Sequence, residues 1–388
     1  MTFYPLVLIV ALLHAFVGWR LAPELVAPWG WVVGLGLAAS AVLMPLGLLG
    51  QRVARQPWAD RLSWVGLLLM GLFSSLFVLT ALRDVLLLAA WAIEALGYAL
   101  PPKSLRTLSG QATPLLALGI TILGFLNARR TPAVVRVDVP IAGLPVALQG
   151  FTLAQISDIH VGPTIKHAFL QRIVAKVNTL NADVVAITGD LVDGKVSELA
   201  GHVAPLAGLK SRHGTFFVTG NHEYYSGAHS WIAELRRLGL TVLMNEHVVL
   251  HHGDVSAVQG NSQITAQLVV AGVNDYTAHY FDSTHRSDPA LALQGAPALT
   301  AVRILLAHQP RSAHAAAAAG FDLQLSGHTH GGQFWPWNLF VPLQQPFTSG
   351  LNRLHNLWVY TSRGTGYWGP PKRFGAPSEI TALRLVAA

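Results

Sequence analysis

The chain has 388 residues, of which 52% are hydrophobic and only 12% are charged. This composition is too apolar for a soluble enzyme, and because most of the excess lies before residue 128, the first third is predicted to be embedded in a membrane. The absence of cysteine excludes disulfides and zinc–thiolate sites, and the net charge of +7 is not gathered in a basic run, so no nucleic-acid partner is predicted.

Four apolar stretches near the N-terminus are long enough to cross a bilayer, which takes about 20 residues of helix. A fifth stretch, Val85–Leu100, is shorter and carries Glu94, so it could span the membrane, lie in the interface or re-enter. We therefore predict an integral membrane protein with membrane lipids as partners. The four stretches are Phe3–Leu21, Val26–Leu49, Leu62–Leu82 and Ala112–Leu126.

Arginines flank these stretches in two groups. Three lie between residues 52 and 61, and three more lie between residues 129 and 136. If Val85–Leu100 does not cross the membrane, both groups fall on one side, and the positive-inside rule then places the C-terminal domain in the cytoplasm. If it does cross, nearly equal numbers of basic residues lie on the two sides of the membrane, and the rule does not decide the orientation.

From about Val137, apolar strands alternate with amphipathic helices such as His167–Leu180, which predicts a layered α/β domain. The segment His251–Asp254 has the composition of a hairpin turn. The predicted strands are Thr152–Ser157, Val184–Thr188, Thr215–Thr219, Leu268–Ala271, Arg303–Ala307, Leu323–Ser326, Leu357–Thr361 and Ile380–Leu385.

Three regions are predicted in the chain as a whole. Residues 1–130 form the transmembrane helical region, residues 131–150 form a linker with a first strand, and residues 151–388 form the α/β domain.

Five polar blocks directly follow predicted strands, at the sheet edge where open α/β folds gather their active residues. Together they offer carboxylates, an amide oxygen and imidazoles, a mixed set that suits borderline divalent ions such as Mn, Fe or Zn. Glycines in three of the blocks allow the chain to leave the strand sharply. The blocks are Asp158-Ile159-His160, Gly189-Asp190, Gly220-Asn221-His222-Glu223, Ala307-His308-Gln309 and Gly327-His328-Thr329-His330.

In this order the blocks resemble the calcineurin-like metallophosphoesterase superfamily, over roughly Phe151 to Leu385. The resemblance implies an α/β/β/α sandwich with two divalent ions, and cleavage of a phosphate ester or diphosphate by attack of a metal-bridging hydroxide. It also implies that Asp190 bridges the ions and that His222, which is not a ligand, lies near the leaving oxygen. The implied ligands are Asp158, His160 and His330 for the first ion, and Asn221, His308 and His328 for the second.

Further segments resemble a membrane-attached branch of this superfamily that includes UDP-diacylglucosamine diphosphatases, which suggests a lipid-linked substrate. The chain departs from that branch, because it has several predicted spans where many relatives have a single leader or anchor helix. The segments are Gln155–Gly162, Gly272–Asp275, Gly331–Gln333 and Arg373–Ile380.

Candidate substrate contacts lie close to the blocks in the sequence. Arg363, Lys372 and Arg373 could bind a second phosphate, although solvated surface charge is an alternative. Tyr224 and Tyr225 could line the pocket beside His222 or pack in the core. Trp335 lies in an aromatic loop that could contact lipid or pack on the protein.

The leading prediction is thus a membrane-bound phosphohydrolase with two metal ions and a phosphate-containing, lipid-linked substrate. One alternative is a phosphodiesterase for soluble nucleotides whose helices serve only as an anchor. Another is a membrane sensor or transporter in which the metal domain is regulatory.

Overall fold

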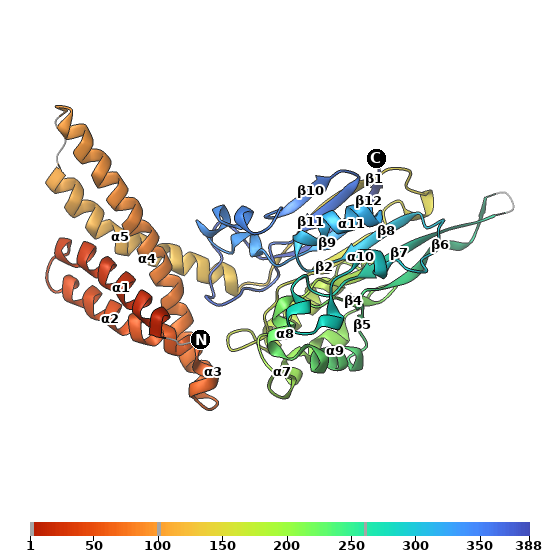
Figure 1. Ribbon diagram of the computed structural model, residues 1–388, viewed down its shortest axis with the longest axis horizontal. Helices are drawn as coiled ribbons and strands as arrows, with labels where there is room; N and C mark the ends of the chain where they lie inside the picture. Colours follow the sequence, from red (N-terminus) through yellow and green to blue (C-terminus); the bar gives the residue numbers. More distant parts are fainter. Residues whose placement is uncertain (1–3, 99–101, 260–261) are drawn as a thin grey trace. The chain divides into compact units, whose positions relative to one another are not determined.

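The computed structural model describes residues 4–98, 102–259 and 262–388. Contacts between residues divide the chain into two compact units (Figure 1). The first unit runs to Arg129 and also contains the distant segment Gly369–Phe374. The second unit contains Arg130–Trp368 and Gly375–Ala388.

The first unit is helical. Four of its helices in the described residues are long and apolar enough to cross a membrane, as predicted. The predicted fifth stretch is not separate, because its residues up to Ala95 continue the preceding helix, while residues 99 and 100 lie outside the described part. The helices are α1 (Tyr4–Leu21), α2 (Trp29–Leu48), the one-turn α3 (Gly50–Val53), α4 (Trp58–Ala95) and α5 (Pro102–Arg129).

Charged side chains join the helices of this unit. At the end of α1, Arg20 binds Asp84 of α4 through two nitrogens, with an Nη2–Oδ1 distance of 2.8 Å. The neighbouring Arg83 is 4% exposed and lies 3.8 Å from Glu24, which also pairs with Arg106 of α5. Ionisable groups among apolar helices are costly unless they pair in this way.

The segment Gly369–Phe374 completes the helical unit from far along the chain. The Lys372 ammonium donates to the carbonyl oxygen of Gly71 at 2.7 Å and to the hydroxyl of Ser75 at 2.5 Å. The backbone N–H of Arg373 donates to the carbonyl of Gly124 in α5 at 2.8 Å. Lys372 and Arg373 are both buried, with exposed fractions of 1% and 0%.

The second unit contains two six-stranded sheets in the described residues, with strand orders β1-β12-β2-β3-β4-β5 and β10-β11-β9-β8-β7-β6. Within the first sheet β2 to β5 run parallel, and within the second β7, β8, β9 and β11 run parallel. The strands are β1 (Ala133–Ile141), β2 (Thr152–Ile156), β3 (Val184–Ile187), β4 (Thr215–Phe217), β5 (Thr241–Val242), β6 (Glu246–Gln259), β7 (Ser262–Gly272), β8 (Val302–Leu306), β9 (Leu323–Ser326), β10 (Gly350–Leu354), β11 (Leu357–Thr361) and β12 (Glu379–Ala387).

The two sheets face each other across one apolar core. Val184 and Ala186 of β3 pack in the same buried cluster as Leu268 and Val270 of β7. This arrangement confirms the predicted layered α/β fold. The helices of the unit are α6 (His167–Asn178), α7 (Val196–Val203), α8 (Asn221–Ser226), α9 (Ala228–Arg237), α10 (Pro289–Ala292) and α11 (Ala313–Ala319).

The turn predicted at His251–Asp254 was wrong. These residues lie inside β6, where His252 pairs with Ala266 and Gly253 pairs with Thr265 of β7. Polar residues and a glycine within a long strand pair have the same composition as a turn, so the sequence did not distinguish the two.

Candidate metal centre

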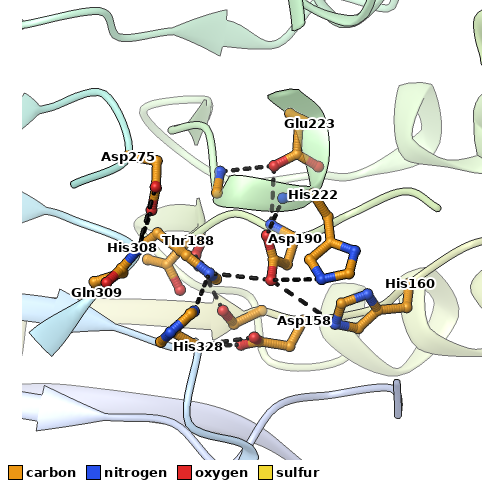
Figure 2. Close-up of polar contacts among 12 residues, drawn as sticks. Asp158, His160, Thr188, Asp190, His222, Glu223, Asp275, His308, Gln309 and His328 are labelled. Atoms are coloured by element: carbon orange, nitrogen blue, oxygen red, sulfur yellow. Dashed lines mark hydrogen bonds and ion pairs between the residues drawn. The ribbon is translucent and has the colours of Figure 1, made fainter. Parts of the chain in front are cut away.

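The polar blocks meet where strands of both sheets end. Asp158 and Asp190 follow the parallel neighbours β2 and β3, and His308 and His328 follow β8 and β9. Figure 2 shows these four side chains and His160 directed toward one another. The structure thus brings together residues that are up to 172 positions apart in the sequence, from Asp158 to His330.

Five residues of the centre have a left-handed backbone conformation, with φ between 50° and 70°. Such conformations cost non-glycine residues about 1–3 kcal/mol each, and they persist at sites where the surrounding structure enforces them. The sharp turns after the strands aim the side chains at one point. The five residues are Asp158, His160, Asp190, His328 and His330.

One group of potential ligands consists of Asp158, His160 and His330. The Nε2 atoms of the two histidines lie 3.0 Å apart, and His330 Nε2 lies 3.4 Å from Asp158 Oδ1. Asp158 is fully buried, and its oxygens accept the backbone N–H of His328 at 2.9 and 3.1 Å. Three donor atoms therefore converge on a common point.

A second group consists of Asp190, His308 and His328. His308 Nε2 lies 3.1 Å from His328 Nδ1 and 3.1 Å from Asp190 Oδ2. The same oxygen of Asp190 lies 4.0 Å from His160 Nε2, which belongs to the first group. Asp190 therefore lies between the two groups.

Hydrogen bonds to the second ring nitrogen orient two of these histidines. His160 Nδ1 donates to Asp193 Oδ1 at 2.9 Å, and His308 Nδ1 donates to the Thr188 carbonyl at 2.7 Å. In both rings these hydrogen bonds leave Nε2 directed at the other donors of the centre. Burial lowers the pKa of His328 to about 3, so this imidazole is neutral.

Asn221 supports the same interpretation. Its side-chain oxygen Oδ1 is buried and has no hydrogen-bond partner among the described residues. A buried amide oxygen is costly without a partner, and a divalent ion would provide one. The oxygen and nitrogen donors of the centre thus fit borderline divalent ions.

Two glycines allow the loops to approach this closely. A Cβ atom on Gly220 would lie 2.2 Å from Asp190 Oδ1, and one on Gly327 would lie 2.2 Å from Asp158 Oδ2. Any other residue would displace a carboxylate of the centre.

Glu223 joins the loop of Asp190 to the loop of Gly220. Its two carboxylate oxygens accept the backbone N–H groups of Asp190 at 3.0 Å, Leu191 at 2.8 Å and Gly220 at 2.6 Å. Burial, and then the nearby Asp190 carboxylate, raise the pKa of Glu223 to about 8 against the effect of these donors. The contacts are structural, since Glu223 binds the backbone of the two loops.

His222 lies beside the centre. Its Nδ1 donates to Asp193 Oδ1 at 2.7 Å, and its Nε2 lies 4.0 Å from Asp190 Oδ2. Burial lowers the pKa of His222, but the Asp190 and Asp193 carboxylates outweigh it and raise that pKa to about 9. The rings of Tyr225 and Trp368 flank the imidazole, with centroids at 5.2 and 5.7 Å.

Sequence reasoning missed Asp193, which contacts both His160 and His222. The available signal was its place three residues after Asp190, within the same loop. Burial would raise the pKa of Asp193, but the two histidines hold it well below the usual range. Asp193 therefore serves as the acceptor that fixes both rings.

The aromatic candidates for substrate contact differ from one another. Of the two tyrosines proposed to line the pocket, Tyr225 has its ring beside His222, whereas the hydroxyl of Tyr224 is hydrogen bonded to His285 Nδ1 at 2.9 Å. Trp335 is 40% exposed. Its contact with lipid stays a prediction.

The basic candidates have other partners. Arg363 lies against Gly331, but its Nε donates to Oε2 of the buried Glu379 at 2.6 Å. Lys372 and Arg373 are 1% and 0% exposed, so neither is the solvated surface charge considered as the alternative. The ammonium of Lys372 is bound to Gly71 and Ser75, and a phosphate contact of Arg373 stays a prediction.

Comparisons with known proteins agree with this geometry. A family model described as calcineurin-like phosphoesterase matches residues 151–332. A protein of Bos taurus described as a transmembrane protein with metallophosphoesterase domain is 42% identical over 284 residues, which cover 71% of this chain and 63% of that protein. An uncharacterised metallophosphoesterase of Helicobacter pylori strain J99 is 38% identical over 275 residues, which cover 70% of this chain and 69% of that protein.

Among solved structures, the calcineurin-like phosphoesterase YfkN of Bacillus subtilis aligns with a TM-score of 0.39 at 14% identity, covering 56% of this chain and 82% of that one. The chain spans less than two thirds of the length of the bovine relative.

Proposed function

The chain belongs to the calcineurin-like phosphoesterase family, and we propose that it is a membrane-anchored hydrolase of phosphate esters that uses divalent metal ions. The observation that carries this proposal is the position of Asp190 between two groups of converging histidine and carboxylate donors. The four apolar helices supply the anchor.

We propose that the centre holds two ions. Asp158, His160 and His330 would bind one, while Asn221, His308 and His328 would bind the other, and Asp190 would bind both. When bound, divalent ions activate water and stabilise negative charge on phosphoryl oxygens. The donor set favours Mn, Fe or Zn over Ca, because it is rich in imidazole.

His222 is proposed to protonate the leaving oxygen. The proposal rests on the orientation of the ring, since Nδ1 is bound to Asp193 and Nε2 is directed at the centre. Its raised pKa keeps this nitrogen protonated at neutral pH, which suits a general acid.

A lipid-linked phosphate ester or diphosphate is the proposed substrate class. The loop after His330 exposes Trp335, Trp337, Leu339 and Phe340, whose side chains are 40%, 40%, 63% and 52% exposed. Exposed aromatic side chains on a membrane protein favour contact with lipid.

The activity is tested with the purified full-length chain in detergent. Hydrolysis of bis-p-nitrophenyl phosphate and p-nitrophenyl phosphate is expected to need Mn²⁺ and to disappear after chelation. The preferred compound separates diester from monoester chemistry, and a lipid-linked diphosphate tests the substrate class. If the protein binds metal but hydrolyses none of these compounds, the proposed activity is wrong.

We also propose that the catalytic unit lies on the cytoplasmic side. With four spans, the loop between α2 and α4 and the chain after α5 share one side of the membrane. Three arginines lie in or beside each of these segments, between residues 52 and 61 and between residues 129 and 136. Positive charge near the ends of spans favours the cytoplasmic side.

Single-cysteine variants test this orientation, because the chain has no cysteine of its own. Ser197 in α7 and Ser104 near the start of α5 are both exposed. In sealed right-side-out vesicles, a membrane-impermeant maleimide is expected to label Ser104→Cys and to label Ser197→Cys only after the vesicles are opened. The reverse pattern would place the catalytic unit outside.

A further inference from the structure

A second cluster of histidine and aspartate lies at the opposite end of the parallel strands of the first sheet, where β3 and β4 begin. Asp183 directly precedes β3 and His213 precedes β4, whereas Asp190 and Asn221 follow these same strands. The third member, His252, lies in β6 of the other sheet. The cluster is therefore separated from the candidate metal centre by the length of the parallel strands.

The donor atoms of this cluster have the spacing of a metal site. His213 Nε2 lies 3.0 Å from His252 Nδ1, which in turn lies 3.8 Å from Asp183 Oδ1. A tetrahedral ion with bonds of about 2.0–2.1 Å holds its donors roughly 3.3 Å apart, a value between these two distances. In the candidate metal centre the facing nitrogens of His160 and His330 are also 3.0 Å apart.

Neighbouring groups hold the three side chains in place. Asp183 Oδ2 accepts the backbone N–H of Thr152 at 2.8 Å and its hydroxyl at 2.9 Å, so the other oxygen is directed at His252. The backbone N–H of His213 donates to the Asp183 carbonyl at 2.8 Å. The Phe151 ring packs on both imidazoles, with centroid distances of 4.8 Å to His252 and 6.0 Å to His213. These contacts fix the positions of all three side chains.

Two members of the cluster are largely buried. The side chains of His252 and Asp183 are only 12% and 18% exposed.

We propose that Asp183, His213 and His252 bind a zinc ion or a similar borderline divalent ion, with water completing the coordination. Asp183 and His213 lead into strands of one sheet, and His252 belongs to the other. The bound ion would therefore link the two sheets at the edge away from the catalytic residues. Its role would be structural.

The test measures zinc bound per chain in the purified full-length protein, after saturation with zinc and removal of the excess by dialysis. The His252→Ala variant is expected to bind one equivalent less than the wild type and to keep its turnover. His251→Ala is the matched control, since His251 is the exposed neighbour in the same strand and should change neither value. His213→Ala, which alters a loop, decides the result if His252→Ala does not fold.

Equal zinc content in the wild type, His213→Ala and His252→Ala would overturn the proposal and leave a hydrogen-bonded histidine pair. As a second readout, Co²⁺ is expected to give weaker visible absorption in either variant than in the wild type. Because zinc is counted independently of hydrolysis, the result stands whether or not the proposed phosphoesterase activity is found.

Discussion

The Asp190→Asn variant is expected to lose at least about 100-fold in turnover, because even a residue that only supports a metal ligand typically contributes 10–100-fold. The amide keeps the size of the carboxylate and can still accept the His222 backbone N–H, which Asp190 Oδ1 binds at 2.9 Å. It lacks the negative charge that would offset repulsion between two bound ions. Turnover of bis-p-nitrophenyl phosphate and metal content per chain are the measurements.

Asp138→Asn is the matched control for this variant. Asp138 lies on the surface of the same unit, where its side chain is 53% exposed and paired with Arg384. Its loss should leave turnover and metal content unchanged. If Asp190→Asn keeps both metal and turnover, Asp190 does not join the two ligand groups.

The His222→Ala variant is expected to lose about 10²- to 10⁴-fold in kcat, the range typical of a general acid. Its metal content should not change, because His222 is not among the proposed ligands. The backbone N–H that binds Asp190 remains in this variant. The loss should shrink for substrates with good leaving groups, since these need less protonation.

The Asp193→Asn variant tests the orientation of the histidine rings separately from the loss of the proton donor His222. Asp193 fixes the rings of both His222 and His160, so this variant is expected to lower kcat and also to weaken metal binding. His229→Ala, an alteration of a side chain that is 74% exposed, serves as the control. Loss of metal from His222→Ala would instead identify His222 as a ligand.

Much of this fold and site could be predicted from the sequence, because the signals were local. Short apolar strands followed at once by Asp158, Asp190 or His308 indicated both the strand and the position of its polar end. The apolar face of α6, with Phe169 and Ile173 buried, was equally visible. The order of the blocks then linked them to one family.

Contacts between distant residues were not visible. Neither the role of Asp193 nor the backbone contact of Arg373 with α5 follows from nearby residues, since each depends on a partner far away in the sequence. The turn at His251–Asp254 was predicted in error for a related reason, because the pairing of β6 with β7 outweighed the local turn composition. Glu94 was ambiguous until the length of α4 showed that Val85–Ala95 continues the same helix.

The segment Gly369–Phe374 has a consequence for the order of events during synthesis. Ribosomes deliver the chain from its N-terminus, so α1 to α5 emerge long before the residues that complete their packing. Lys372 is among the last 20 residues of 388, yet its ammonium binds Gly71 and Ser75. The packing of these helices can therefore be completed only after nearly the whole chain has been synthesised. A chain that terminates early would lack the contacts of Lys372 even though every apolar stretch is already present.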